Sequence, residues 1–115
     1  MAHFRLSDPA QADLGAILDT SQDRWGEAAR NRYEALLEAA MQSIAADPEG
    51  PLTRARTKIF PGVRSFHVRH ARRARGVKAP VHVIIFRINR SGMIEILRIL
   101  HERMEPSLHV MSRLT

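Results

Sequence analysis

A dense helix-breaking stretch, Asp-Pro-Glu-Gly-Pro at positions 47–51, divides the chain into two parts with different hydrophobic periodicity. Proline lacks a backbone donor and clashes with the preceding helical turn, so no helix continues through this stretch. Before it, apolar residues recur at helical spacing, and after it they fall into short runs rich in β-branched residues. Helices followed by strands predict an α+β fold.

The segment before this stretch is expected to form a short strand and a helical hairpin. The strand is HFRL, at residues 3–6. A first helix starts at Asp8 as its N-cap, with Gln11 placed to complete a capping box, and ends at Gly26. A second helix covers residues 27–46, where the apolar residues fall on one face. Two helices joined by a tight glycine turn form a hairpin.

The segment after the stretch is expected to form three strands, at residues 63–70, 81–88 and 93–100. The middle run, VHVIIFRI, is nearly all apolar and β-branched, which predicts a central strand covered on one face and partly on the other. The turn at 89–92 is short enough to make the last two strands an antiparallel hairpin. The predicted fold is therefore an N-terminal strand, a helical hairpin and a three-stranded antiparallel sheet, in one domain spanning 1–115.

Charge is distributed unevenly along the chain. Residues 1–50 carry 4 Lys and Arg against 9 Asp and Glu, a net charge of −5, whereas residues 51–115 carry 14 against 3, a net charge of +11. A loop at 69–80 contains five of these basic residues, which are Arg69, Arg72, Arg73, Arg75 and Lys78. Because arginine forms forked contacts with carboxylates and phosphates, the basic half is expected to meet an acidic or polyanionic partner. The alternative is a solubilising surface without a partner.

Several chemistries lack their characteristic residues. The chain has no cysteine, which excludes disulfides, thiol nucleophiles and thiolate metal sites. It has no G-x-S-x-G motif, no glycine-rich phosphate loop and no H-E-x-x-H motif, and its six histidines are expected at strand ends and surfaces. No apolar run approaches the roughly 20 residues that span a bilayer. We therefore expect no metal, no cofactor, no membrane contact and no export signal.

The stretch LSDPAQADLGAILDTSQDRWGEAARNRYEALLEAAMQSIAADPEG resembles the helical hairpin of ParE/RelE superfamily toxins from type II toxin–antitoxin modules. The stretches GVRSFHVRH, PVHVIIFRI and IEILRILHERMEPSLH are similar to the strands and tail that follow it, so the resemblance covers nearly the whole chain. The ending resembles the ParE branch most specifically, with Glu105 where that branch often has aspartate. Its matching residues are Leu100, His101, Arg103, Met104, Glu105 and His109.

The resemblance implies a cytoplasmic bacterial toxin held in a hetero-oligomer by a cognate antitoxin, ParD-like or other. Operator DNA is then bound only through the antitoxin. The antitoxin is expected to cover the hairpin, at Leu14, Leu18, Trp25, Tyr33 and Leu37. ParE toxins inhibit DNA gyrase by binding, so gyrase is the expected target and no catalytic residue is expected. Target-binding residues would be Arg69, Arg72, Arg73, Arg98, His101 and Arg103, and residues 96–110 would form a strand edge and tail used for recognition.

Two other functions remain open at this point. The first is a RelE-type, ribosome-dependent mRNA endoribonuclease, whose catalytic residues would be His101, Arg64, Arg87 and Arg98. One ribonuclease pattern, that of YoeB-like toxins, has an arginine after the histidine that matches His82, whereas this chain has Val83. An aliphatic side chain cannot stabilise phosphate charge, which favours the inhibitor. The second is a non-toxic basic binding module.

Overall fold

The computed structural model describes residues 3–71, 77 and 79–114. Its elements in chain order are β1 (Phe4–Leu6), α1 (Asp8–Trp25), α2 (Glu27–Ala46), β2 (Arg54–Ala55), β3 (Val63–His67), the 3₁₀ helix η1 (Val68–Ala71), β4 (His82–Ile88), β5 (Ile94–His101) and α3 (Ser107–Leu114). The predicted α+β class and the helical hairpin are confirmed.

The sheet has five strands in the order β1-β5-β4-β3-β2. β1 pairs with β5 in parallel, and the other neighbours are antiparallel. The predicted three-stranded antiparallel sheet is thus too small, because β1 joins it and β2 extends its far side. β5 lies between β1 and β4, so the prediction that residues 96–110 provide a strand edge is wrong. β1 and β2 are too short for their periodicity to reveal their pairing.

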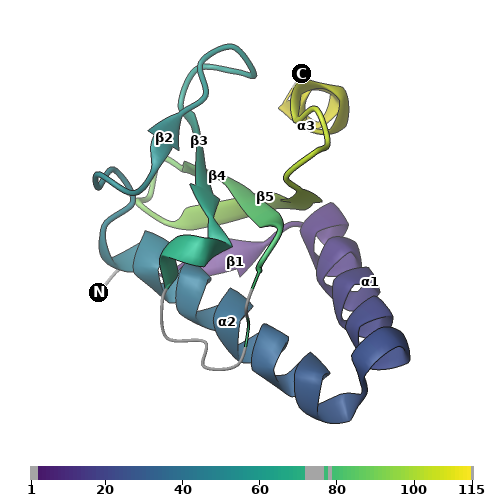
Figure 1. The fold of residues 1–115 in the computed structure, drawn as a ribbon. Coiled ribbons are helices and arrows are strands. Elements are labelled where there is room, and N and C mark those ends of the chain that lie inside the picture. Colours follow the sequence, from purple (N-terminus) through teal and green to yellow (C-terminus); the bar gives the residue numbers. More distant parts are fainter. Residues whose placement is uncertain (1–2, 72–76, 78, 115) are drawn as a thin grey trace.

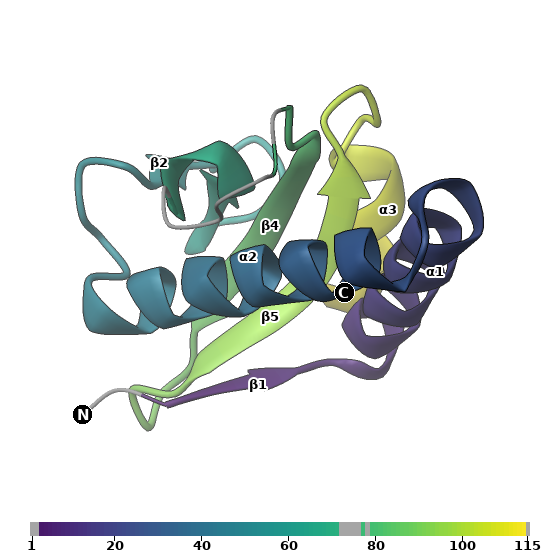
Figure 2. The ribbon, with the colours of Figure 1, turned by 60° about the horizontal axis from the view of Figure 1, so that its bottom comes forward.

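Helices and loops cover the two faces of the sheet unequally. α1 and α2 pack against one face, and α3 lies on the other side of the sheet (Figures 1 and 2). The larger core, on the hairpin side, includes Leu36, Leu37, Ile44, Phe66, Ile84, Phe86 and Ile96. The smaller core includes Ile59, Val63, Ile85, Leu97, Leu100 and Val110. Side chains of β4 and β5 are buried on both faces, which explains their nearly continuous apolar sequences.

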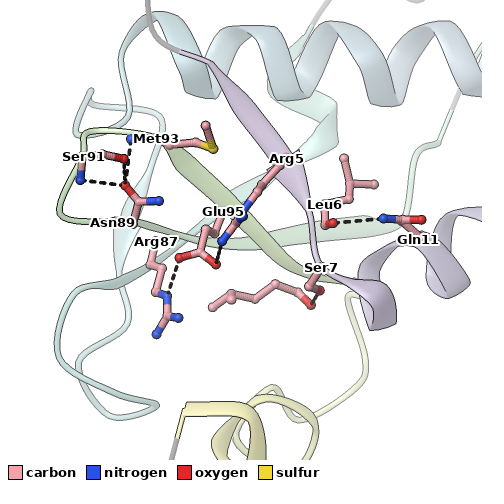
Figure 3. A network of polar contacts seen from close by, with 10 residues as sticks. Arg5, Leu6, Ser7, Gln11, Arg87, Asn89, Ser91, Met93 and Glu95 are labelled. Carbon is pink, nitrogen blue, oxygen red and sulfur yellow. Dashed lines mark hydrogen bonds and ion pairs between the residues drawn. The ribbon is translucent and has the colours of Figure 1, made fainter.

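The first helix begins one residue earlier than expected. Ser7, not Asp8, is the N-cap, and its Oγ accepts a hydrogen bond of 3.1 Å from the Ala10 backbone N–H. The same hydroxyl donates to the Leu97 carbonyl at 2.8 Å, so this cap also joins the helix start to β5. Gln11 does not complete a capping box, because its side-chain amide donates to the Leu6 carbonyl instead (Figure 3).

Two predicted segments end differently. The strand expected at 63–70 stops at His67, where its pairing with β4 ends opposite Val83, and continues as η1. The tail expected after β5 contains α3, a helix of 8 residues whose pattern is too short to stand out in the sequence. Gly26 does separate the two long helices as predicted, at a φ of 90° that favours glycine.

A polar network ties three strands together at one end of the sheet (Figure 3). Glu95 of β5 accepts from Arg5 of β1 and from Arg87 of β4, each at 3.3 Å. In the turn that follows β4, the Asn89 side-chain oxygen accepts from the backbone N–H groups of Ser91 and Met93. Arg87 therefore has a structural partner within the sheet.

Candidate functional site

A cavity lies beside the helical hairpin, and we call it the hairpin groove. It has a volume of about 590 Å³ and is bounded by α1, the start of α2 and the adjoining ends of β4 and β5. Its lining is mostly apolar or uncharged. The lining residues are Ala16, Ile17, Thr20, Ser21, Arg24, Trp25, Tyr33, Ala79, Val81, His82 and His101.

The second cavity, which we call the sheet hollow, has a volume of about 320 Å³. Val83, Ile85 and Leu100 contribute to its lining, and two of them, Ile85 and Leu100, belong to the smaller core. Charged and ring-bearing side chains surround this apolar part. The full lining is Leu52, Arg54, Arg56, Ser65, His67, Arg69, His70, Val83, Ile85, Leu100, His101, Glu102, Met104 and Pro106. His101 lines both cavities, so the groove and the hollow meet at the end of β5.

A tyrosine and two histidines form a cluster at that meeting point. The Tyr33 hydroxyl lies 2.5 Å from His82 Nδ1 and accepts from the Val81 backbone N–H at 3.4 Å. The His82 and His101 rings pack edge to face with centroids 5.9 Å apart. Burial, followed by the charges of neighbouring His101 and His67, lowers the pKa of His82 to about 4. Burial also raises the pKa of Tyr33, so near pH 7 both groups are neutral.

A second pair of histidines lies across the hollow. The His67 and His70 ring centroids are 6.4 Å apart, because η1 turns the chain back immediately after β3. In the strand predicted at 63–70, residues three apart would point to opposite faces, so the early end of β3 at His67 is what allows the two rings to approach. His67 Nε2 is 3.5 Å from Glu102 Oε1 but makes no hydrogen bond within the described residues.

Arg98, predicted both as a target contact and as a possible catalytic residue, is a structural clamp. Its guanidinium donates to both carboxylate oxygens of Asp13 in α1, at 2.7 and 2.8 Å, and to the His109 carbonyl at 3.1 Å. Asp13 also accepts from the Ile99 backbone N–H at 2.9 Å. The hydrogen bond with Asp13 raises the pKa of Arg98 further. This clamp joins α1, β5 and α3.

The residues proposed for the ribonuclease alternative do not come together. Arg64 donates to the Thr53 hydroxyl at 2.7 Å, Arg87 pairs with Glu95, and Arg98 pairs with Asp13. Neither cavity includes any of these three arginines in its lining, whereas His101 lines both. His101 therefore has no cation from the predicted set beside it.

The residues predicted to bind an antitoxin divide into two groups. Leu18 and Leu37 are 3% and 0% exposed and belong to the larger core, and Leu14 packs against it. Trp25 is 68% exposed, and both Trp25 and Tyr33 line the hairpin groove. Periodicity located the apolar side of the hairpin without separating its core residues from its accessible ones.

The residues predicted to bind the target are also dispersed. Arg69 and His101 line the sheet hollow, and Arg103 is exposed on the turn after β5. Arg72 and Arg73 lie outside the described residues. Sequence reasoning missed Arg54 and Arg56, which line the hollow beside Arg69. The two arginines are two positions apart in an extended segment, and this spacing puts both side chains on one side of the chain. That spacing could have identified them as a pair in the sequence.

The described ranges 3–71, 77 and 79–114 include no group of three or more His, Asp or Glu residues arranged to hold a metal ion. Within the same ranges, no helix is long and apolar enough to cross a membrane.

The fold is thus a helical hairpin on one face of a five-stranded sheet whose first strand pairs in parallel with β5. The family model for the ParE toxin of the type II toxin–antitoxin system parDE matches residues 4–106. The chain belongs to the ParE toxin family, and an antitoxin partner follows from that membership.

Curated relatives agree with this assignment, and a solved structure shares the fold. The chain is 33% identical over 104 residues to Toxin ParE1 of Mycobacterium tuberculosis, covering 90% of this chain and 93% of the relative. It is 30% identical over 115 residues to Toxin ParE of Escherichia coli, covering 99% and 98%. A chromosomal ParDE system from P. aeruginosa has the same fold, with a TM-score of 0.66 at 22% identity over 88% of this chain and 96% of that chain.

Proposed function

We propose that this ParE-family toxin acts in the bacterial cytoplasm as an inhibitor that binds DNA gyrase. The observation that supports binding over catalysis is the use of Arg64, Arg87 and Arg98 in contacts within the chain. Cleavage of RNA needs a cation at the phosphate beside a proton donor and acceptor. The arginines expected to supply that cation are held elsewhere by their partners.

The proposed antitoxin is ParD-like, forms a hetero-oligomer with the toxin and alone binds operator DNA. We propose that it covers the hairpin groove, with Trp25 as the main anchor. Trp25 lines this mostly apolar cavity and is 68% exposed. Burial of so large an aromatic side chain by a partner would contribute strongly to the free energy of binding. Tyr33 lines the same groove, whereas Leu18 and Leu37 are buried in the larger core.

The proposed target is tested by supercoiling of relaxed plasmid DNA by purified gyrase. The full chain should inhibit supercoiling, and addition of its antitoxin should restore it. Topoisomerase I, which relaxes DNA without gyrase, provides the control for effects on DNA itself. Unimpaired supercoiling at a large excess of toxin would contradict the proposal.

A further inference from the structure

Three arginines line the sheet hollow without a partner of opposite charge. Arg54 comes from β2, Arg56 from the segment that follows it, and Arg69 from η1. In the part of the chain that the structure describes, none of the three has an ion pair, in contrast to Arg5 and Arg98. Three guanidinium groups from separate segments thus share one small cavity.

The hollow has little negative charge to balance them. Glu102 is the one carboxylate among the described residues of its lining, and Glu102 Oε1 lies 3.5 Å from His67 Nε2. A cavity with low-dielectric walls and excess charge of one sign concentrates counter-ions. The hollow therefore favours an anionic ligand over a neutral one.

The donors and acceptors of the lining indicate which anion fits. Guanidinium groups donate only, and acceptor side chains in the lining are few, chiefly Glu102 and Ser65. A peptide brings backbone N–H groups that need acceptors when buried, so an acidic peptide would leave donors unsatisfied here. A phosphodiester backbone brings acceptors without such donors, and arginine matches its oxygens in forked geometry.

The volume and the lining of the hollow also suit the base of a nucleotide. A volume of about 320 Å³ is at the lower end of ligand cavities, which run from about 300 Å³, and is too small for a helix or a duplex. The rings of His67, His70 and His101 and the apolar side chains of Val83 and Leu100 offer surfaces for an unstacked base.

We propose that the sheet hollow binds single-stranded nucleic acid, with Arg54, Arg56 and Arg69 holding its phosphates. The hollow includes Arg69 and His101, which were predicted as target contacts, but its nucleic-acid binding is measured without gyrase and does not depend on the gyrase proposal. The proposal concerns binding of nucleic acid in the hollow and includes no cleavage step.

The test uses the full chain and fluorescein-labelled oligothymidylate and oligouridylate of about ten nucleotides, within the site sizes common for single strands. Fluorescence anisotropy is measured against salt for the native chain and for Arg54→Ala/Arg56→Ala. A charge-matched control, Arg32→Ala/Arg90→Ala, removes two exposed arginines that do not line the hollow. Unlabelled oligoglutamate of equal charge serves as competitor.

The proposal predicts that Arg54→Ala/Arg56→Ala weakens binding by about tenfold or more, as loss of charge-assisted hydrogen bonds implies. The slope of log K against log salt should become shallower by about 1.4, since each phosphate contact on a single strand contributes about 0.7. The control should keep most of the affinity, and oligoglutamate should compete poorly. Preference for either oligonucleotide supports the site and shows whether it distinguishes the two strands by their sugar or their base methyl group.

Three results would overturn it: no binding at low salt, equal weakening in both double variants, or efficient displacement by oligoglutamate. The last would assign the hollow to protein carboxylates. Circular dichroism checks the fold of each variant. If changes at β2 disturb folding, Arg69→Ala, on η1 and exposed, gives the same comparison from a separate segment.

Discussion

The hairpin groove and the sheet hollow meet at His101 but differ in how they can recognise a partner. The groove is larger, about 590 Å³ against 320 Å³, and its lining is mostly apolar or uncharged, with Arg24 as the one permanently charged residue among the described residues that line it. Among the residues that the structure describes, the hollow combines three arginines that have no ion pair with one carboxylate. The groove is thus suited to burial of a partner's apolar side chains, and the hollow to capture of an anion.

This difference follows from the elements that build each cavity. Two long helices provide the groove with an accessible apolar stripe. The hollow takes its charges from β2, η1 and the turn after β5, which are short segments around a sheet face that α3 covers only in part. Apolar recognition therefore depends on regular secondary structure, and the excess charge depends on the irregular connections between its elements.

The largest expected effect is on stability, from loss of the Arg98 clamp that joins α1, a helix that bounds the hairpin groove, to β5. Arg98→Ala leaves the Asp13 carboxylate, mostly buried, without its bidentate partner. We expect the free energy of unfolding in urea to fall by about 3 kcal/mol. Arg5→Ala removes an exposed arginine from its pair with Glu95 and should cost less than about 1 kcal/mol. Similar losses for both variants would contradict the structural role of Arg98.

A smaller effect is expected at the rim of the groove. Trp25→Ala should weaken antitoxin binding by about 2 kcal/mol in titration calorimetry, because an exposed aromatic anchor is truncated. Its thermal midpoint without antitoxin should change little, since the side chain is 68% exposed. Leu108→Ala is the control, an 80% exposed apolar residue on α3 outside the groove. Unchanged antitoxin affinity in Trp25→Ala would remove the groove from the interface.

Acid should destabilise the region where the two cavities meet. The unfolded chain protonates His82 below about pH 6.5, whereas the folded chain, with its pKa of about 4, does not until the pH approaches 4. Stability from this group is complete above pH 6.5 and is lost as the pH falls toward 4. The full shift corresponds to about 3 kcal/mol, and partial exposure of the ring reduces our expectation to roughly 1–2 kcal/mol.

Urea unfolding at pH 7, 5.5 and 4, compared between the native chain and His82→Gln, isolates this contribution from other titrating groups. The difference between the two proteins should shrink as the pH falls. A constant difference would show that His82 is not buried as a neutral ring.

The smallest effect is expected for the hydroxyl that joins the hairpin to β4. Tyr33→Phe keeps the ring in the groove and removes the contact with His82 Nδ1. The free energy of unfolding should fall by about 1 kcal/mol, the usual contribution of one hydrogen bond. Thermal unfolding at pH 7 measures it. No change in stability would show that water replaces the hydroxyl at His82 without loss.

Much of the fold could be predicted because its main elements are long and regular. The bounds of α2 and the glycine between α1 and α2 follow from periodicity and turn chemistry. The size of the sheet did not, because the 3 residues of β1, expected as a strand, carry no sign of its pairing with β5, and the 2 residues of β2 are too few to be expected as a strand. The cap at Ser7 was missed for a similar reason, since its second hydrogen bond is to Leu97.

The candidate sites were harder to predict because burial and pairing decide which residues are available. Leu37 and Trp25 lie on the same apolar side of the hairpin, yet one is in the core and the other is exposed. Arg98 and Arg69 are both basic residues of the second half, yet Arg98 is bound to Asp13 and Arg69 lines the hollow. Local sequence carries no information on which arginine finds a carboxylate 85 positions away.

The central claim, a ParE-family toxin that binds gyrase and does not cleave messenger RNA, is tested most directly in bacteria. DNA and protein synthesis are followed by pulse labelling immediately after the toxin is induced, with a strain that also expresses the antitoxin as control. The account predicts that DNA synthesis falls first, with signs of DNA damage, and that the antitoxin prevents this. A fall in protein synthesis before DNA synthesis would contradict it and make His101 a catalytic candidate.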